Sequence, residues 1–207
     1  MMAGMAKLPD SEQTSRPWRI HELVGDFQLL DVWALPTPGG SDEFPQLVEI
    51  IASSDTMDSE SRAARALWAI RWKLGEVFGW DEVKEADLPS WQMLRDRLPE
   101  DLRAVPSGPE FEELPFRSVY LLDEEWAAEV ANKTVHGVMH ISWVPDGQGR
   151  YRGQMAVYVK PNGLFGRAYL AAIQPFRHLV VYPPMMRQLG RMWREGRGSQ
   201  WSVPRNG

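Results

Sequence analysis

Hydrophobic and polar residues alternate along the second half of the chain, which is the period expected of β-strands. The alternation predicts strands near residues 116–122, 125–131, 134–144 and 150–160. The last two flank Pro145–Gly149, whose Asp-Gly sequence is typical of a hairpin turn. One face of these strands is apolar and the other carries His136 and His140. We therefore expect an antiparallel sheet with one buried face and one solvent-exposed face.

The first half of the chain contains one strand and two helices. Residues 26–35 are rich in strand-forming residues and end at Pro36, and residues 44–52 have the pattern of a short helix. Apolar residues recur at spacings of four and three over Ser61–Phe78, which predicts an amphipathic helix with Arg71 at the edge of its apolar stripe.

A similar spacing over residues 163–195 predicts one long C-terminal helix. Pro175 is expected to kink it, and Pro183-Pro184 to break or restart it. The order of elements predicts a single α+β domain over 21–195, in which a curved sheet grips the last helix. Residues 1–20 and 196–207 are polar and irregular, so we expect a flexible leader and a flexible tail.

Composition narrows the functional classes. The 207 residues suit one hydrophobic core. Cysteine is absent, which excludes disulfides and thiolate chemistry. No apolar run is long enough for a signal peptide or a membrane span, so we expect a cytoplasmic protein without integral membrane association. No phosphate-binding loop, nucleophile elbow or catalytic triad is recognisable, so we predict neither a cofactor nor catalytic residues.

Charge is unevenly distributed along the chain. Residues 163–207 contain seven arginines and one acid, a balance of +6; because the whole chain carries −5, residues 1–162 carry −11. We expect the two parts to attract each other within the fold. The alternative is that the basic C-terminal helix docks on an anionic partner or membrane surface. An acidic protein is a poor general binder of nucleic acid, so none is expected as a partner.

The C-terminal segment Pro161-Asn-Gly-Leu-Phe-Gly-Arg-Ala-Tyr169, followed by Pro175-Phe-Arg-His178, carries a resemblance. It is similar to a bacterial domain-of-unknown-function family, number 2867, within the START-like (SRPBCC, helix-grip) superfamily. Members show Pro-x-Gly-x-x-Gly-x-x-Tyr and then Pro-Phe-His; here Arg177 stands at the expected histidine and His178 follows. Asp31-Val-Trp33 resembles the family's acidic–small–aromatic pattern. The resemblance implies a helix-grip fold and a cavity, without implying a reaction.

Two sets of residues carry candidate chemistry. His136 and His140 lie four residues apart on a predicted strand, about 13 Å at roughly 3.3 Å per residue, which is too far for one metal ion. We expect both to be solvated or hydrogen-bonded on the outer face, and no metal site. Asp31 and Trp33 lie on the same face of the predicted strand, so Asp31 is buried if that face points inward. The alternative is that the opposite face, with Leu30, Val32 and Ala34, points inward. A buried Asp31 needs a partner, for which Arg71 and Arg167 are the candidates.

The prediction is a small-molecule-binding protein that holds an apolar or amphipathic ligand between the sheet and the C-terminal helix. A cyclase-like enzyme using Asp31, Tyr169 or His178 for proton transfer is the alternative, and an interaction module is a third reading. A homodimer is compatible with each. The expected ligand-binding residues are Asp31, Trp33, Arg71, Met139, Trp143, Tyr151, Met155, Phe165, Tyr169 and Phe176.

Overall fold

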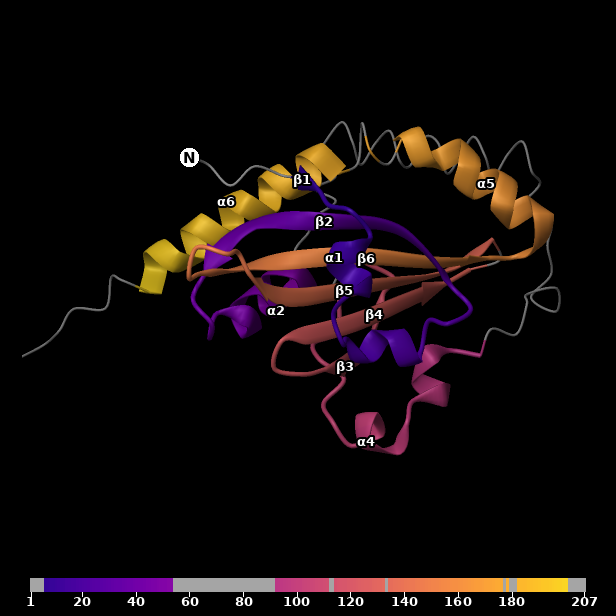
Figure 1. Cartoon of the computed structure of the whole chain (residues 1–207), viewed down its shortest axis with the longest axis horizontal. Coiled ribbons are helices and arrows are strands. Elements are labelled where there is room, and N and C mark those ends of the chain that lie inside the picture. The colour runs from indigo at the N-terminus through magenta and orange to yellow at the C-terminus, as the bar shows by residue number, and fades with distance from the viewer. Residues whose placement is uncertain are drawn as a thin grey trace, which may run out of the picture.

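The computed structural model describes residues 6–53, 92–111, 114–132, 134–176, 178 and 182–200. The predicted helix over residues 61–78, and Arg71 with it, lie outside the described residues. The described elements form a six-stranded sheet with short helices on one face and longer helices on the other (Figure 1). In chain order they are β1 (Ala6–Lys7), α1 (Ser11–Thr14), η1 (Arg19–Glu22), β2 (Gln28–Gly39), α2 (Phe44–Ser53), η4 (Leu94–Arg97), α4 (Glu100–Arg103), β3 (Arg117–Leu121), β4 (Glu125–Ala131), β5 (Val135–Pro145), β6 (Tyr151–Pro161), α5 (Gly163–Phe176) and α6 (Tyr182–Gln200).

The sheet has the order β1-β2-β6-β5-β4-β3, and all its neighbours are antiparallel. The predicted alternating strands are confirmed, and so is the hairpin between β5 and β6. Its turn contains Gly147 and Gly149, both at φ 77°, where only glycine is free of strain. The Asp146 carboxylate accepts hydrogen bonds from the backbone N–H groups of Gln148 and Arg150, which holds the turn closed.

Strand β2 is longer than predicted, because it continues through Pro36 and Pro38 to Gly39. Proline lacks a backbone N–H, and every N–H of an interior strand has a neighbouring strand to bond to. On the outer edge of β2, the paired residues of β1 lie opposite Trp33 and Ala34, before the prolines begin. A register shift between Ala34 and Pro38 then accommodates the prolines against β6.

The sheet face that meets α2 and α6, here called the helix face, carries a core with four buried tryptophans from different elements: Trp33, Trp126, Trp143 and Trp193. Trp143 of β5 lies 5.8 Å from Trp193 of α6 and 6.3 Å from Phe44 of α2, measured between ring centres. The indole N–H of Trp143 donates to the carbonyl of Gly40, and that of Trp193 donates to the carbonyl of Pro38. These bonds pair the indole N–H groups of Trp143 and Trp193 within the core.

The opposite face, here called the N-terminal face, is buried, and the prediction that it is exposed to solvent is wrong. Ile20, Leu23 and Val24 pack on it from the N-terminal segment, and Leu94, Leu98 and Leu102 pack on it from the segment that contains η4 and α4. Residues 6–20, predicted to form a flexible leader, add β1 to the sheet and place α1 over this face (Figure 1). Because few residues of this segment are apolar, its packing on the sheet could not be predicted from its composition.

The C-terminal segment forms two helices, α5 and α6, instead of one long helix to residue 195. Pro183 and Pro184 lie in the first turn of α6, where backbone N–H groups need no partner within the helix. Pro175 lies in the last turn of α5. The predicted restart at Pro183-Pro184 is confirmed, and α6 extends into the predicted tail as far as Gln200. Among the described helices, none has a stretch long and apolar enough to cross a membrane.

Candidate functional site

A β-bulge in β2 turns Asp31 toward the helix face. Leu29 lies opposite Tyr158 and Asp31 lies opposite Val157, so Leu30 is the extra residue of β2. Asp31 is fully buried, at 0 % exposure, and Trp33 is buried beside it. Asp31 and Trp33 therefore point into the helix-face core, whereas Val32 and Leu29 are packed on the N-terminal face, so both faces of β2 are covered.

Within the described residues, three donors converge on the Asp31 carboxylate from different parts of the chain. Oδ1 lies 2.7 Å from His178 Nε2, at the junction of α5 and α6, and 3.1 Å from Lys7 Nζ of β1. The Tyr182 hydroxyl of α6 donates to Oδ2 at 3.2 Å. A buried carboxylate requires such donors. Among the described residues, the donors are a lysine, a histidine and a tyrosine. Of the two arginines expected as partners, Arg71 lies outside the described residues and Arg167 is exposed on α5.

His178 has one nitrogen on Asp31 and one that is free among the described residues. Because the ionised carboxylate accepts a hydrogen bond, Nε2 carries the proton, and Nδ1 makes no hydrogen bond to the described part of the chain. The His178 side chain is 25 % exposed. Its ring meets Trp33 edge-to-face, with ring centres 5.8 Å apart, and Tyr182 lies 4.9 Å from Trp33. The histidine thus links a buried charge to solvent.

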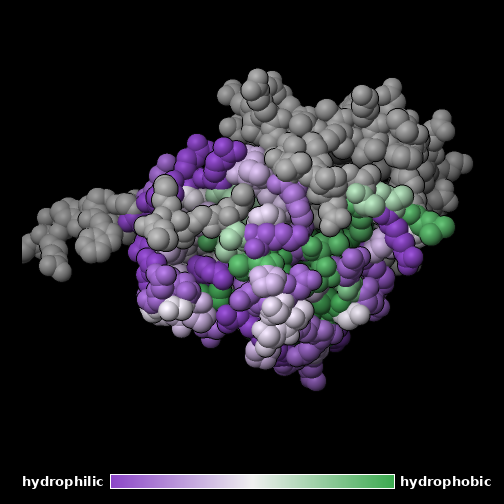
Figure 2. All heavy atoms as spheres, turned by 45° about the horizontal axis from the view of Figure 1, so that its top comes forward, coloured by the Kyte–Doolittle hydropathy of each residue, from purple (hydrophilic) through white to green (hydrophobic). Residues whose placement is uncertain are grey.

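A cleft of about 190 Å³ lies between β2, the end of β6 and α5, and Asp31, His178 and Tyr182 are not among its lining residues. Its apolar lining includes Leu30, the neighbour of Asp31 in the bulge, and its charged lining residue is the exposed Arg167. Figure 2 shows a band of hydrophobic residues across the middle of the face in view, continuing to the side on which α5 lies. The residues around the cleft are Gln28, Leu30, Pro161, Arg167, Leu170 and Ala171.

The residues expected to bind ligand lie in two places. Asp31 and Trp33 belong to the group just described. Trp143 and Met155 are buried in the core of the helix face, and Met139 and Tyr151 pack half-buried against that core. The Tyr151 ring stacks on Trp143 with ring centres 6.5 Å apart. Phe165, Tyr169 and Phe176 lie on α5, but their side chains are outside the described part of the structure, as is Arg71.

A second carboxylate–histidine pair lies on the N-terminal face. His140 Nε2 is 2.9 Å from Glu125 Oε2, and the Tyr120 hydroxyl donates to the same oxygen at 3.0 Å. The backbone N–H of Arg19 donates to Glu125 Oε1. Burial raises the pKa of Glu125, but the hydrogen bond from His140 and the other donors outweigh it, so that pKa is lowered overall. Burial and the Glu125 charge raise the pKa of Tyr120.

Gln13 of α1 covers the Glu125–His140 pair and contacts the second nitrogen of His140. Its amide nitrogen lies 3.0 Å from His140 Nδ1 and donates to the Tyr158 hydroxyl, also at 3.0 Å, while its amide oxygen accepts a hydrogen bond from Gln154. Gln13 and His140 are both fully buried. Burial raises the pKa of Tyr158 to about 12. Both nitrogens of His140 are therefore occupied by neighbours, which is the arrangement expected of a structural histidine.

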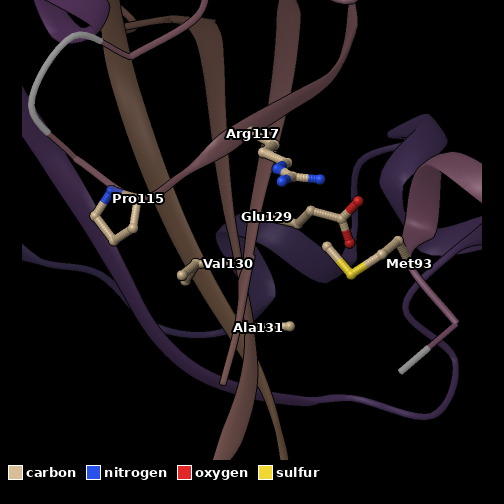
Figure 3. A pocket seen from close by; sticks show the side chains of 6 residues that line it. All are labelled: Met93, Pro115, Arg117, Glu129, Val130 and Ala131. Atoms are coloured by element: carbon tan, nitrogen blue, oxygen red, sulfur yellow. The ribbon is translucent and has the colours of Figure 1, made fainter. Parts of the chain in front are cut away.

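A third pair, Glu129 and His136, borders a separate cleft of about 280 Å³ at the edge of the sheet (Figure 3). Figure 3 shows the Glu129 side chain pointing toward Met93, with Val130 directed to the opposite side. The Glu129 carboxylate accepts hydrogen bonds from the backbone N–H groups of Leu94 and Arg95 and lies 2.7 Å from His136 Nε2. Both of its oxygens are occupied, so this cleft is the weaker candidate for a polar ligand.

Sequence reasoning missed Glu125 and Glu129, although a signal for them exists. The two glutamates are four residues apart on β4, as His136 and His140 are on β5, so each pair shares one face of its strand. Each glutamate lies two positions along β4 from the residue opposite its histidine, at Ala127 and Ala131. Such diagonal neighbours are within reach of each other across an antiparallel pair. In the described residues, no three metal-binding side chains come together.

The basic charge of the C-terminal segment is partly neutralised within the fold. Arg197 of α6 lies 3.2 Å from Glu43 and donates to the Pro38 carbonyl. This contact joins the basic helix to the acidic first part of the chain, as the preferred interpretation of the charge asymmetry predicts. Arg187, Arg191 and Arg194 are exposed on the same helix.

Comparison with known proteins assigns the chain to a family. Residues 23–184 match the family described as Protein of unknown function (DUF2867), which covers more than half of the chain. The chain belongs to this family. In this DUF2867 member, the matched range begins at Leu23, which packs on the N-terminal face, and it includes Asp31, His178 and Tyr182. No curated protein and no solved structure matches it.

Proposed function

We propose that this DUF2867 protein binds a small amphipathic molecule in the cleft between β2, β6 and α5, with the polar end of the ligand toward Asp31, His178 and Tyr182. The supporting observation is a fully buried carboxylate whose histidine partner is a quarter exposed, together with a largely apolar cleft that is lined by Leu30, the residue before Asp31. Ligand sites combine these features, because apolar walls provide affinity and a few polar groups orient the ligand.

The size and lining of the cleft limit the ligand. Its volume of about 190 Å³ is below the 300–1,000 Å³ or so that is usual for drug-sized ligands. It suits a short chain or one ring, or one end of a larger molecule. Leu30, Pro161 and Leu170 contact the apolar part in this arrangement. Arg167 stands where an anionic group at the entrance is stabilised.

We also assign the domain to the helix-grip, START-like architecture and to the cytoplasm. Support for the architecture comes from the curved antiparallel sheet with C-terminal helices on one face, together with the motif around Gly163.

Native mass spectrometry of the freshly purified protein, followed by solvent extraction of the same sample, tests the binding proposal. We expect an excess mass that matches an extracted small molecule. Ala171→Trp fills the cleft and should remove the excess mass, whereas Ala168→Trp, also on an exposed position of α5 but away from the cleft lining, should retain it. A clean mass together with no heat of binding for octanoate would contradict the proposal.

A cyclase-like enzyme is the second candidate, and the Asp31–His178 pair favours it. A carboxylate that orients an imidazole leaves Nδ1 as a proton acceptor, which is the arrangement of a general base. Incubating the extracted molecule with the protein in deuterium oxide tests this function. Deuterium incorporation at carbon that is lost in His178→Gln would support catalysis, and binding without incorporation would identify a carrier.

A further inference from the structure

Trp33 differs from the other tryptophans of the helix-face core in its hydrogen bonding. The indole N–H groups of Trp126, Trp143 and Trp193 donate to Ser118 Oγ, the Gly40 carbonyl and the Pro38 carbonyl, respectively. Trp33 is equally buried, at 6 % exposure, but its Nε1 has no acceptor among the described residues. Buried donors in folded proteins are nearly always paired, so an unpaired one indicates a missing acceptor.

The neighbours of Trp33 show where that acceptor belongs. His178 meets the indole edge-to-face at 5.8 Å, and its Nδ1 is also free of hydrogen bonds to the described residues. Asp31 holds the imidazole from the other side at 2.7 Å, which fixes the orientation of the ring. The rings that carry these two nitrogens have their centres 5.8 Å apart, so a polar group bound at one nitrogen lies beside the other ring.

We propose that Trp33 and His178 form a recognition pair for the carboxylate group of an amphipathic ligand, an inference that rests on the proposed binding function. One ligand oxygen accepts the indole N–H of Trp33. Binding takes up one proton from water onto His178 Nδ1, and the resulting imidazolium donates a hydrogen bond to the other ligand oxygen while Nε2–H stays on Asp31. The ligand class is therefore a small carboxylic acid with an apolar body, which lies along Leu30 and Leu170 in the adjacent cleft.

Two probes with the same chain length and different polar ends test this pair. Octanoate carries the carboxylate, and 1-octanol offers one weaker acceptor on an equivalent apolar chain. Charge-assisted hydrogen bonds are stronger than neutral ones, so we expect octanoate to bind about tenfold more tightly than octanol. Trp33→Phe should remove most of that ratio while changing octanol affinity less than about twofold, and His178→Gln should act in the same direction.

The indole N–H resonance of Trp33 in a ¹H–¹⁵N spectrum, assigned with Trp33→Phe, gives an independent measurement. Octanoate should move it downfield, and octanol should move it much less. Trp18 is the matched control, because its Nε1 is also buried without an acceptor but lies on the N-terminal face, where Trp18 meets His140 at 5.7 Å. Its resonance should not move, and Trp18→Phe should leave the affinity ratio unchanged.

The outcomes separate the two proposals. Equal affinity for both probes, or an unshifted Trp33 resonance on octanoate binding, would overturn the recognition pair and leave the binding function standing. A response at Trp18 in place of Trp33 would overturn it as well, by placing the acid on the other face. Failure of both probes to bind would overturn the binding function and the recognition pair together.

Discussion

The Glu125–His140 and Asp31–His178 pairs lie on opposite faces of the same sheet and use the same two functional groups. In the first pair, His140 is fully buried, Gln13 takes its second nitrogen, and Glu125 receives three donors. In the second pair, the carboxylate is as well buried, but His178 is 25 % exposed and its second nitrogen is free among the described residues.

That difference separates a structural role from a functional one better than residue type does. A satisfied, closed pair holds the N-terminal segment on the sheet and has no capacity left for a ligand. An open pair next to an unpaired indole N–H and a cleft retains that capacity. Each prediction below tests one side of this comparison.

Glu125→Ala should have the largest effect. It leaves His140 Nε2, the Tyr120 hydroxyl and the Arg19 N–H without their acceptor in a buried site. Breaking such a pair costs about 3–5 kcal/mol of unfolding free energy, measurable by urea denaturation. Glu124→Ala, at the exposed neighbouring position, should change stability by no more than about 0.5 kcal/mol. A loss below about 1 kcal/mol in Glu125→Ala would show that the closed pair is not structural.

Gln13→Ala should destabilise the protein by roughly 1–3 kcal/mol, because His140 Nδ1, Tyr158 and Gln154 lose a buried partner together. Thr14→Ala, at an exposed position of the same short helix, serves as the control. Equal stability of the two variants by urea denaturation would mean that residues 6–20 contribute little to the fold and behave as the leader expected from sequence.

His178→Gln should lower stability by less than about 1 kcal/mol, since its side chain is partly exposed, but should weaken octanoate binding about tenfold. Urea denaturation and calorimetric titration measure the two effects on one sample. A large stability loss with unchanged binding would reverse the comparison, making the open pair structural.

Asp26 is an exposed carboxylate, in contrast to the buried Glu125 and Asp31, and its substitution should have the smallest effect on stability. Burial raises the pKa of Asp26, but hydrogen bonds from Lys160 and Arg97 outweigh it and lower this pKa to about 2. The folded-state pKa is thus below the ordinary value of about 3.9, so the stabilisation is present above pH 4 or so and is lost as pH falls through about 2. Because the Asp26 side chain is 42 % exposed, Asp26→Asn should cost only a few tenths of a kcal/mol at pH 7.

Urea denaturation at pH 7, 4 and 3 checks the prediction for Asp26→Asn. The stability difference from the wild type should shrink as the pH falls. A difference that grows toward acid pH would show that the ion pair does not act as described.

The strands and the hairpin at Gly147 could be predicted because they depend on local alternation and turn chemistry. The face on which Asp31 lies stayed open, because the bulge at Leu30 breaks the alternation of β2. The partners of Asp31 could not be predicted, since Lys7 and His178 come from the two ends of the chain and no local pattern pairs them. The burial of His140 was missed for the same reason. It depends on Gln13, the buried residue of a four-residue helix too short to show a period.

The most direct test of the central claim compares the histidines in one experiment. Imidazole ¹H–¹³C resonances, assigned with His178→Gln and His140→Gln, are followed while octanoate is added to the wild-type protein. The open pair predicts that the His178 resonances move with saturation, while those of His140 stay in place. Movement of His140 with an unchanged His178 would contradict the assignment of the ligand site to Asp31 and His178.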